Sequence, residues 1–177
     1  MGSLNSPEIG KLKCIFMMGV AGCGKTTIGI RLASLIHGDF IDADWYHSKK
    51  AKEKMSKGIP LNDEDRQIWL EELAEIAAAA SKRTVIACSA LKITYRRILT
   101  KKLKTDEYIF IHLNVPKSEL ERRLTARIDH FFNPELLQSQ LQTLEAPLEC
   151  ERCCVIDANS SKDEVLSRVL NFVEKLL

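Results

Sequence analysis

Residues 19–26, GVAGCGKT, constrain the fold of this 177-residue chain more than any other segment, because they match the pattern G-x-x-x-x-G-K-[ST]. Glycines at these positions let the backbone wrap tightly, so that its N–H groups point inward at phosphate oxygens. An apolar run at 13–18 precedes the loop as a predicted strand, and helical spacing follows it. The segment therefore predicts a nucleoside-triphosphate site, in which Lys25 reaches the β- and γ-phosphates and the Thr26 hydroxyl binds Mg²⁺.

Apolar runs and amphipathic stretches alternate along the rest of the chain. Strands are predicted at 13–18, 39–41, 84–88, 108–113 and 153–156, and helices at 26–36, 63–81, 92–104, 135–144 and 162–177. Another helix is expected after Pro116, with a capping box formed by Ser118 and Glu121, and Asn62 is the expected N-cap of the helix from 63. Strands separated by helices indicate a parallel sheet with helices on both faces. We expect one α/β domain over residues 13–177, preceded by a flexible tail over residues 1–12.

Charge and composition argue against several other classes of protein. The chain has 26 Lys and Arg against 24 Asp and Glu, and a net charge of +2 disfavours a dedicated nucleic-acid surface. No apolar run approaches the roughly 18–20 residues of a membrane span, and no signal-peptide pattern follows the start, so a cytoplasmic location without stable membrane association is expected. The six cysteines are then expected to be reduced thiols.

Two acidic residues, Asp42 and Asp44, follow the second predicted strand. Residues two apart in an extended segment face the same side, so both carboxylates can point toward the phosphates. One can organise Mg²⁺ while the other accepts a proton from an attacking hydroxyl. The chain lacks the Asn-Lys-x-Asp segment of GTPases, and Ser89 and Asn114 stand where motor-type ATPases place an acid. This pattern favours a small-metabolite kinase, and a solvated acidic turn is the alternative.

Five segments occur in the order GVAGCGKTT, FIDADWYH, KMSKGIPLNDEDRQIWL, VIACSALKITYRR and HFFNPELLQSQLQTLEAP. Together they resemble the gluconokinase family, relatives of shikimate and adenylate kinases, over residues 15–157. The resemblance implies a P-loop fold like that of nucleoside-monophosphate kinases, with a five-stranded parallel sheet, a substrate flap at about 45–80 and a mobile lid at about 127–145. It also implies ATP- and Mg²⁺-dependent phosphorylation of the small sugar acid D-gluconate at its 6-hydroxyl, giving 6-phosphogluconate, and a homodimer.

The resemblance, together with residue chemistry, assigns roles to individual positions. The expected catalytic residues are Lys25, Asp44 and Arg127, and the expected Mg²⁺ residues are Thr26 and Asp42. The expected nucleotide-binding residues are Gly19, Val20, Ala21, Gly22, Cys23, Gly24, Lys25, Thr26, Thr27 and Arg123. The expected substrate-binding residues are Asp44, His47, Arg66, Ser89, Lys92, Arg96, His130 and Gln140. Arginine and lysine in the last set suit the recognition of a carboxylate.

Two rival functions stay open at this point. A sister kinase acting on shikimate or on a nucleoside monophosphate would use the same phosphate loop. A nucleotide-dependent binding protein without turnover would need the loop as well, but it would not require the Asp42 and Asp44 pair or the arginines Arg123 and Arg127.

Overall fold

The computed structural model describes residues 11–57, 59, 61–126 and 134–177. The elements are β1 (Cys14–Met18), α1 (Lys25–Leu35), β2 (Asp39–Asp42), the 3₁₀ turn η1 (Ala43–Tyr46), α2 (Lys49–Ser56), α3 (Asp63–Ala79), β3 (Thr84–Ala87), α4 (Ile93–Thr100), η2 (Thr105–Glu107), β4 (Tyr108–Asn114), α5 (Lys117–Thr125), α6 (Pro134–Thr143), β5 (Cys153–Asp157) and α7 (Lys162–Glu174). Five strands form a parallel sheet in the order β2-β3-β1-β4-β5, which confirms the predicted α/β fold.

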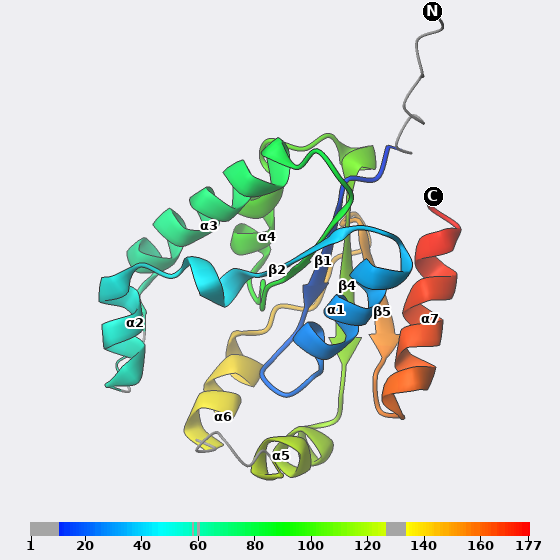
Figure 1. Cartoon of the computed structure of the whole chain (residues 1–177). Helices are drawn as coiled ribbons and strands as arrows, with labels where there is room; N and C mark the ends of the chain where they lie inside the picture. The colour runs from blue at the N-terminus through cyan, green and yellow to red at the C-terminus, as the bar shows by residue number, and fades with distance from the viewer. Residues whose placement is uncertain (1–10, 58, 60, 127–133) are drawn as a thin grey trace, which may run out of the picture.

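Two apolar layers cover the two faces of the sheet. Alternate residues of the central strand β1 point to opposite faces, and all five are buried, as expected for a parallel strand covered on both sides. Ile15 and Met17 pack with residues of α1 and α7, while Phe16 packs with residues of α3 and α4 and stacks on Phe110 with ring centroids 4.8 Å apart. Figure 1 shows the two helix pairs on either side of the sheet.

The strands all run in one direction, so their carboxyl ends meet at one edge. The loop at 19–24 follows β1 there, Asp42 ends β2, and Ser89 comes just after β3. In Figure 1, α5 and α6 lie beyond this edge, beside the loop that joins β1 to α1. Open α/β sheets bind ligands outside the carboxyl ends of their strands, so this edge is where a site is expected.

Several element predictions need correction. The predicted helix over 92–104 ends already at Thr100, and the capping box of Ser118 and Glu121 is wrong, because α5 has Pro116 as its N-cap without a side-chain hydrogen bond. Helix α2 has no counterpart among the predicted elements, because its sequence KKAKEKMS holds only two apolar residues, of which Ala51 is buried. The Asn62 cap is confirmed, as its side chain accepts a hydrogen bond from the Asp65 N–H at 2.8 Å.

The predicted tail and the predicted lid can be compared with the residues that the structure describes. Leu12 is buried in the core, so the packed part of the domain begins before residue 13. Residues 1–10 of the predicted tail, and residues 127–133 of the predicted lid, lie outside the described residues. Among the helices that the structure describes, none is long and apolar enough to cross a membrane.

Candidate active site

The loop between β1 and α1 has the conformation that its glycines permit. Gly19, Gly22 and Gly24 have φ angles of 136°, 83° and 107°, in the region that side-chain-bearing residues avoid. A Cβ at Gly19 would also lie 2.8 Å from the Cys23 Sγ, and one at Gly22 would lie 2.9 Å from the Leu124 side chain. The glycines therefore allow both the turn and the close packing of the loop.

Lys25 lies at the start of α1 and reaches back into this loop. Its Nζ donates hydrogen bonds to the carbonyl oxygens of Gly19 at 3.0 Å and Val20 at 3.1 Å. The ammonium group thus sits within the turn where phosphate oxygens are expected, next to the positive end of the α1 dipole. Thr26 and Thr27 follow in the exposed first turn of the helix.

Arg123, on α5, lies against the same loop. Its guanidinium donates to the Cys23 carbonyl oxygen at 3.5 Å, to the Ala158 carbonyl oxygen at 2.8 Å and to Glu119 at 2.7 Å. Hydrogen bonds from Arg122 and Arg123 lower the pKa of Glu119 to about 2. The structure therefore places Arg123 beside the phosphate loop, where it contacts the loop backbone, and its expected binding of nucleotide stays a prediction.

Thr26 and Asp42 are joined across the gap between α1 and β2. The Thr26 Oγ1 donates to the Asp42 Oδ2 at 2.9 Å, and the Asp42 Oδ1 accepts from the Asp44 N–H at 3.1 Å. A hydroxyl and a carboxylate are oxygen ligands of the kind that Mg²⁺ takes, and Mg²⁺ often uses only one or two protein ligands beside substrate phosphates. The pair therefore fits a magnesium ion.

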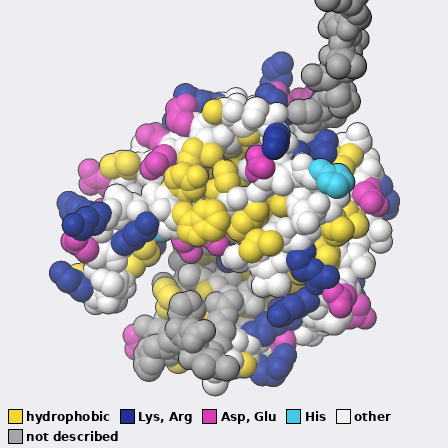
Figure 2. Space-filling model, in the orientation of Figure 1, with side chains coloured by type: hydrophobic (Ala, Val, Ile, Leu, Met, Phe, Trp, Pro, Cys, Tyr) yellow, Lys and Arg dark blue, Asp and Glu magenta, His cyan; other side chains and the backbone are white. Residues whose placement is uncertain are grey.

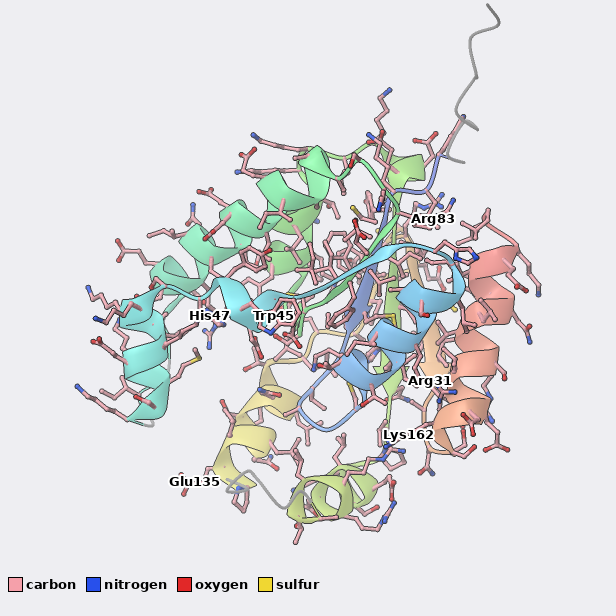
Figure 3. The ribbon with its side chains drawn as sticks, viewed as in Figure 1. Arg31, Trp45, His47, Arg83, Glu135 and Lys162 are labelled. Atoms are coloured by element: carbon pink, nitrogen blue, oxygen red, sulfur yellow. The ribbon has the colours of Figure 1, made fainter. Side chains whose placement is uncertain are left out.

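Asp44 follows on η1, with its side chain 83% exposed. Its Oδ1 lies 3.6 Å from the Nε2 of His47, and this side-chain interaction, with a smaller contribution from Lys25, lowers the pKa of Asp44. His47 is 8% exposed and stacks on Trp69 with ring centroids 4.2 Å apart, and the Trp69 indole N–H donates to the Ala43 carbonyl oxygen. Figure 3 shows His47 and Trp45 on the turn between β2 and α2.

Arg66 on α3 and Lys92 before α4 converge on an acid that the sequence analysis did not select. The Lys92 Nζ lies 3.2 Å from the Asp63 Oδ1, and an Arg66 guanidinium nitrogen lies 3.8 Å from the same oxygen. The Tyr95 hydroxyl donates to this oxygen at 2.7 Å, and the hydrogen bonds from Tyr95 and then Lys92 lower the pKa of Asp63. Asp63 begins a helix, where an acid is ordinary, so its sequence position held no sign of this contact.

Three other predicted substrate-binding residues, Ser89, Gln140 and Arg96, lie in different surroundings. Ser89 lies next to the phosphate loop, because its carbonyl oxygen accepts the Gly19 N–H at 3.2 Å. Gln140, on α6, lies against the phosphate loop, where its Oε1 accepts the Ala21 N–H at 2.7 Å. Arg96 is 1% exposed and forms a two-point ion pair with Glu151, so its expected role as a substrate contact does not fit its position. A buried guanidinium must be paired, and the protein itself supplies the partners.

Arg127 and His130, expected to be catalytic and substrate-binding, lie outside the described residues.

Beyond the site, lysines gather over α2 at one side of the molecule, as Figure 2 shows.

A family model described as shikimate kinase matches residues 21–174. The chain is 42% identical to a probable gluconokinase of Dictyostelium discoideum, over 90% of this chain and 86% of that protein. It is 36% identical to the thermoresistant gluconokinase of Escherichia coli strain K12, over 90% of this chain and 92% of that protein.

Solved structures of other kinases are also similar to this chain. A gluconokinase from Sinorhizobium meliloti 1021 superposes with a TM-score of 0.85 at 35% identity, covering 93% of each chain. A shikimate kinase from Acinetobacter baumannii has a TM-score of 0.61 at 17% identity, which shows the shared fold alone. The phosphate loop, the acids after β2 and these similarities lead to one conclusion: the chain belongs to the gluconokinase family of P-loop kinases, on the fold of shikimate kinase.

Proposed function

We propose that this protein transfers the γ-phosphoryl group of ATP to the 6-hydroxyl of D-gluconate, giving 6-phosphogluconate and ADP. The observation that carries the proposal is the placement of Asp44 two residues after the Thr26-bonded carboxylate of Asp42, at the mouth of the phosphate loop. This arrangement puts an acceptor-binding acid beside the expected metal and phosphates. The names of the relatives, gluconokinases of several organisms, support the choice of substrate.

The phosphate loop and Lys25 are proposed to bind the nucleotide. Backbone N–H groups of residues 20–26 surround the phosphates, and Lys25 exchanges its two carbonyl partners for β- and γ-phosphate oxygens. Thr26 and Asp42 would hold Mg²⁺, which would neutralise part of the negative charge of the nucleotide phosphates. Arg127 is proposed to add a further positive charge near the transferred group, and Arg123 supports the loop from behind.

Asp44 orients the acceptor. Its carboxylate accepts a hydrogen bond from the 6-hydroxyl, so that the oxygen attacks the γ-phosphorus as the bond to the β–γ bridging oxygen breaks. The hydroxyl proton passes to Asp44 as the new P–O bond forms. Asp44 is ionised at neutral pH, as an aspartate ordinarily is, and its lowered pKa keeps it so; it can therefore accept this hydrogen bond. His47 and Trp69 hold η1, and with it Asp44, against α3.

Arg66 and Lys92 are proposed to bind the carboxylate of the sugar acid. In the structure both side chains lie beside the carboxylate of Asp63. A substrate carboxylate would bind the same two cations in its place or next to it. An arginine fork suits a planar carboxylate, and a polyol needs hydroxyl partners, for which Tyr95, Ser89 and the proposed His130 are available. Closure of the flap and lid would exclude water, which otherwise competes with the sugar for the phosphoryl group.

An acceptor panel tests the proposed function. Purified protein with Mg²⁺ and ATP is mixed with gluconate, other sugar acids, shikimate or AMP, and ADP release is followed in each case. We expect release that depends on gluconate, with mass spectrometry finding one phosphoryl group on the product. Release with shikimate or AMP alone would replace gluconate by a sister substrate. Release with no acceptor at all would indicate a simple ATPase, and no release with any acceptor would leave a nucleotide-binding protein without turnover.

Assembly and location belong to the same proposal. A homodimer and a cytoplasmic reaction, both expected from the sequence analysis, stay predictions that sedimentation and cell fractionation would test.

A further inference from the structure

The turn that carries Ser89 and Lys92 from β3 into α4 is held by its backbone. The Ser89 carbonyl oxygen accepts the Gly19 N–H at 3.2 Å, and Ala90 adopts a φ of 46°, which is unusual for a residue with a side chain. A strained backbone of this kind persists only where surrounding contacts impose it. After the strained residue, the turn is contacted by Arg96 of α4 and by the segment of residues 145–151, which we name the brace.

Arg96 connects this turn to the brace. One terminal nitrogen, Nη1, donates to the carbonyl oxygens of Ala90 at 3.1 Å, Leu91 at 3.3 Å and Glu145 at 3.3 Å. The Nε and Nη2 donate to the two carboxylate oxygens of Glu151 at 2.7 and 2.9 Å. With 1% of Arg96 exposed, these bonds replace the water that its charge would otherwise need.

Glu145 completes the connection at the start of α4. Lys92 is the N-cap residue of this helix but makes no side-chain cap hydrogen bond. Instead, the Glu145 Oε2 accepts the Ile93 N–H at 2.6 Å, and the Glu145 N–H donates to the Leu91 carbonyl oxygen at 2.8 Å. A carboxylate at a helix N-terminus satisfies an open N–H group and interacts favourably with the helix dipole.

We propose that Glu145 and Arg96 are positioning residues for the acceptor half of the site, and that the brace sets where Lys92 and Ser89 stand. The inference rests on the proposed function, in which Lys92 binds the substrate carboxylate. The proposal follows from the position of Lys92 between Leu91 and Ile93, whose backbones are both hydrogen-bonded to Glu145. The Lys92 side chain extends from this fixed backbone to Asp63. Movement of this backbone would shift the ammonium group relative to Arg66.

The nucleotide half of the site depends less on the brace. The phosphate loop meets the braced turn where the Gly19 N–H donates to the Ser89 carbonyl oxygen, but its conformation is set by its own glycines between β1 and α1, and Lys25 bonds within it. Loss of the Glu145 contacts should therefore weaken acceptor binding selectively. A residue with a merely structural role would instead lower the amount of folded protein and leave both KM values unchanged.

Three variants of the full-length chain test this inference. Glu145→Ala removes the cap, Glu145→Gln keeps an oxygen that can accept the Ile93 N–H, and Glu149→Ala removes an exposed acid from the same segment as a matched control. For Glu145→Ala we expect the KM for gluconate to rise about fivefold to tenfold, the scale of a lost helix cap, with the KM for ATP within about twofold. Glu145→Gln should recover most of the loss, and Glu149→Ala should match the wild type.

Equal rises in both KM values, or an unchanged KM for gluconate, would overturn the inference. A second measurement separates it from the proposed function: amide hydrogen exchange at Ile93 should be slowed in the wild type and accelerated in Glu145→Ala. If the wild-type protein does not phosphorylate gluconate, the proposed function fails by itself. Unchanged Ile93 exchange in Glu145→Ala would refute the brace whichever acceptor the panel identifies.

Discussion

The hydroxyl of Thr26 donates a hydrogen bond to the carboxylate of Asp42, with 2.9 Å between the oxygens, and so joins the first turn of α1 to the end of β2. These two residues are 16 positions apart in the chain. The bond brings the hydroxyl and the carboxylate that are proposed to hold Mg²⁺ together beside the phosphate loop, and the Asp44 N–H donates to the same carboxylate.

Substitution Asp42→Asn should weaken the use of Mg²⁺. The amide keeps the size of the side chain but loses the charge that favours a divalent cation, so we expect the Mg²⁺ concentration for half-maximal rate to rise about 10- to 100-fold. The measurement is the initial rate against Mg²⁺ at fixed ATP. Asp39→Asn, at the exposed start of the same strand, is the control and should leave the Mg²⁺ dependence unchanged.

Substitution Asp44→Asn should lower kcat by about 10²- to 10⁴-fold, the usual contribution of a group that accepts a proton in the reaction. The KM for ATP should change little, because the phosphate loop is untouched. Steady-state rates with ATP and gluconate varied in turn would check this. A variant with near-normal kcat would rule out Asp44 as the acceptor's partner and direct attention to another acid.

Substitution Arg66→Ala should act mainly on substrate affinity. Removal of one charged hydrogen-bonding partner of the substrate carboxylate is expected to raise the KM for gluconate about 10- to 100-fold. The KM for ATP should stay near its wild-type value. Arg97→Ala, which removes an exposed arginine from α4, serves as the control, and a similar rise in that variant would argue against a specific role for Arg66.

The pH dependence of stability should reveal the interaction of Glu119 with Arg122 and Arg123. Their hydrogen bonds lower the Glu119 pKa to about 2, below its usual value of about 4.3. A carboxyl whose folded pKa is depressed adds stability above its unfolded pKa, and this stability is lost as the pH falls toward the folded pKa.

We therefore expect Glu119→Gln to lower the Tm at pH 7, and the difference from the wild type to shrink between about pH 4.3 and pH 2. Thermal unfolding at several pH values measures the difference. Glu121→Gln, on the same helix, is the comparison, because its ion pair with Lys117 is longer, at 3.8 Å. A Tm difference for Glu119→Gln that stayed constant down to pH 3 would contradict the assignment.

Much of the framework follows from the sequence by itself. The phosphate loop, the strand before it and the helix after it are encoded in neighbouring residues, through the glycines and the apolar run. Asp42 and Asp44 could be selected because the end of a predicted strand is also a local signal. The prediction that both lie in one extended segment is wrong, because the chain turns after Asp42, and Asp44 lies in the 3₁₀ turn η1. The parallel α/β fold follows from the alternation of strands and helices.

Tertiary structure decided what the local pattern could not. Arg96 has the chemistry of a ligand for a carboxylate, and the sequence analysis placed it at the substrate, but packing buries it against Glu151, 55 residues away. Gln140 meets the phosphate loop across 119 residues, and Glu145 caps a helix that begins 52 residues earlier. No period or spacing specifies such partners, because they are set by which elements pack together. A charged side chain tells which chemistry is available, and burial in the folded chain determines whether a ligand or the protein uses it.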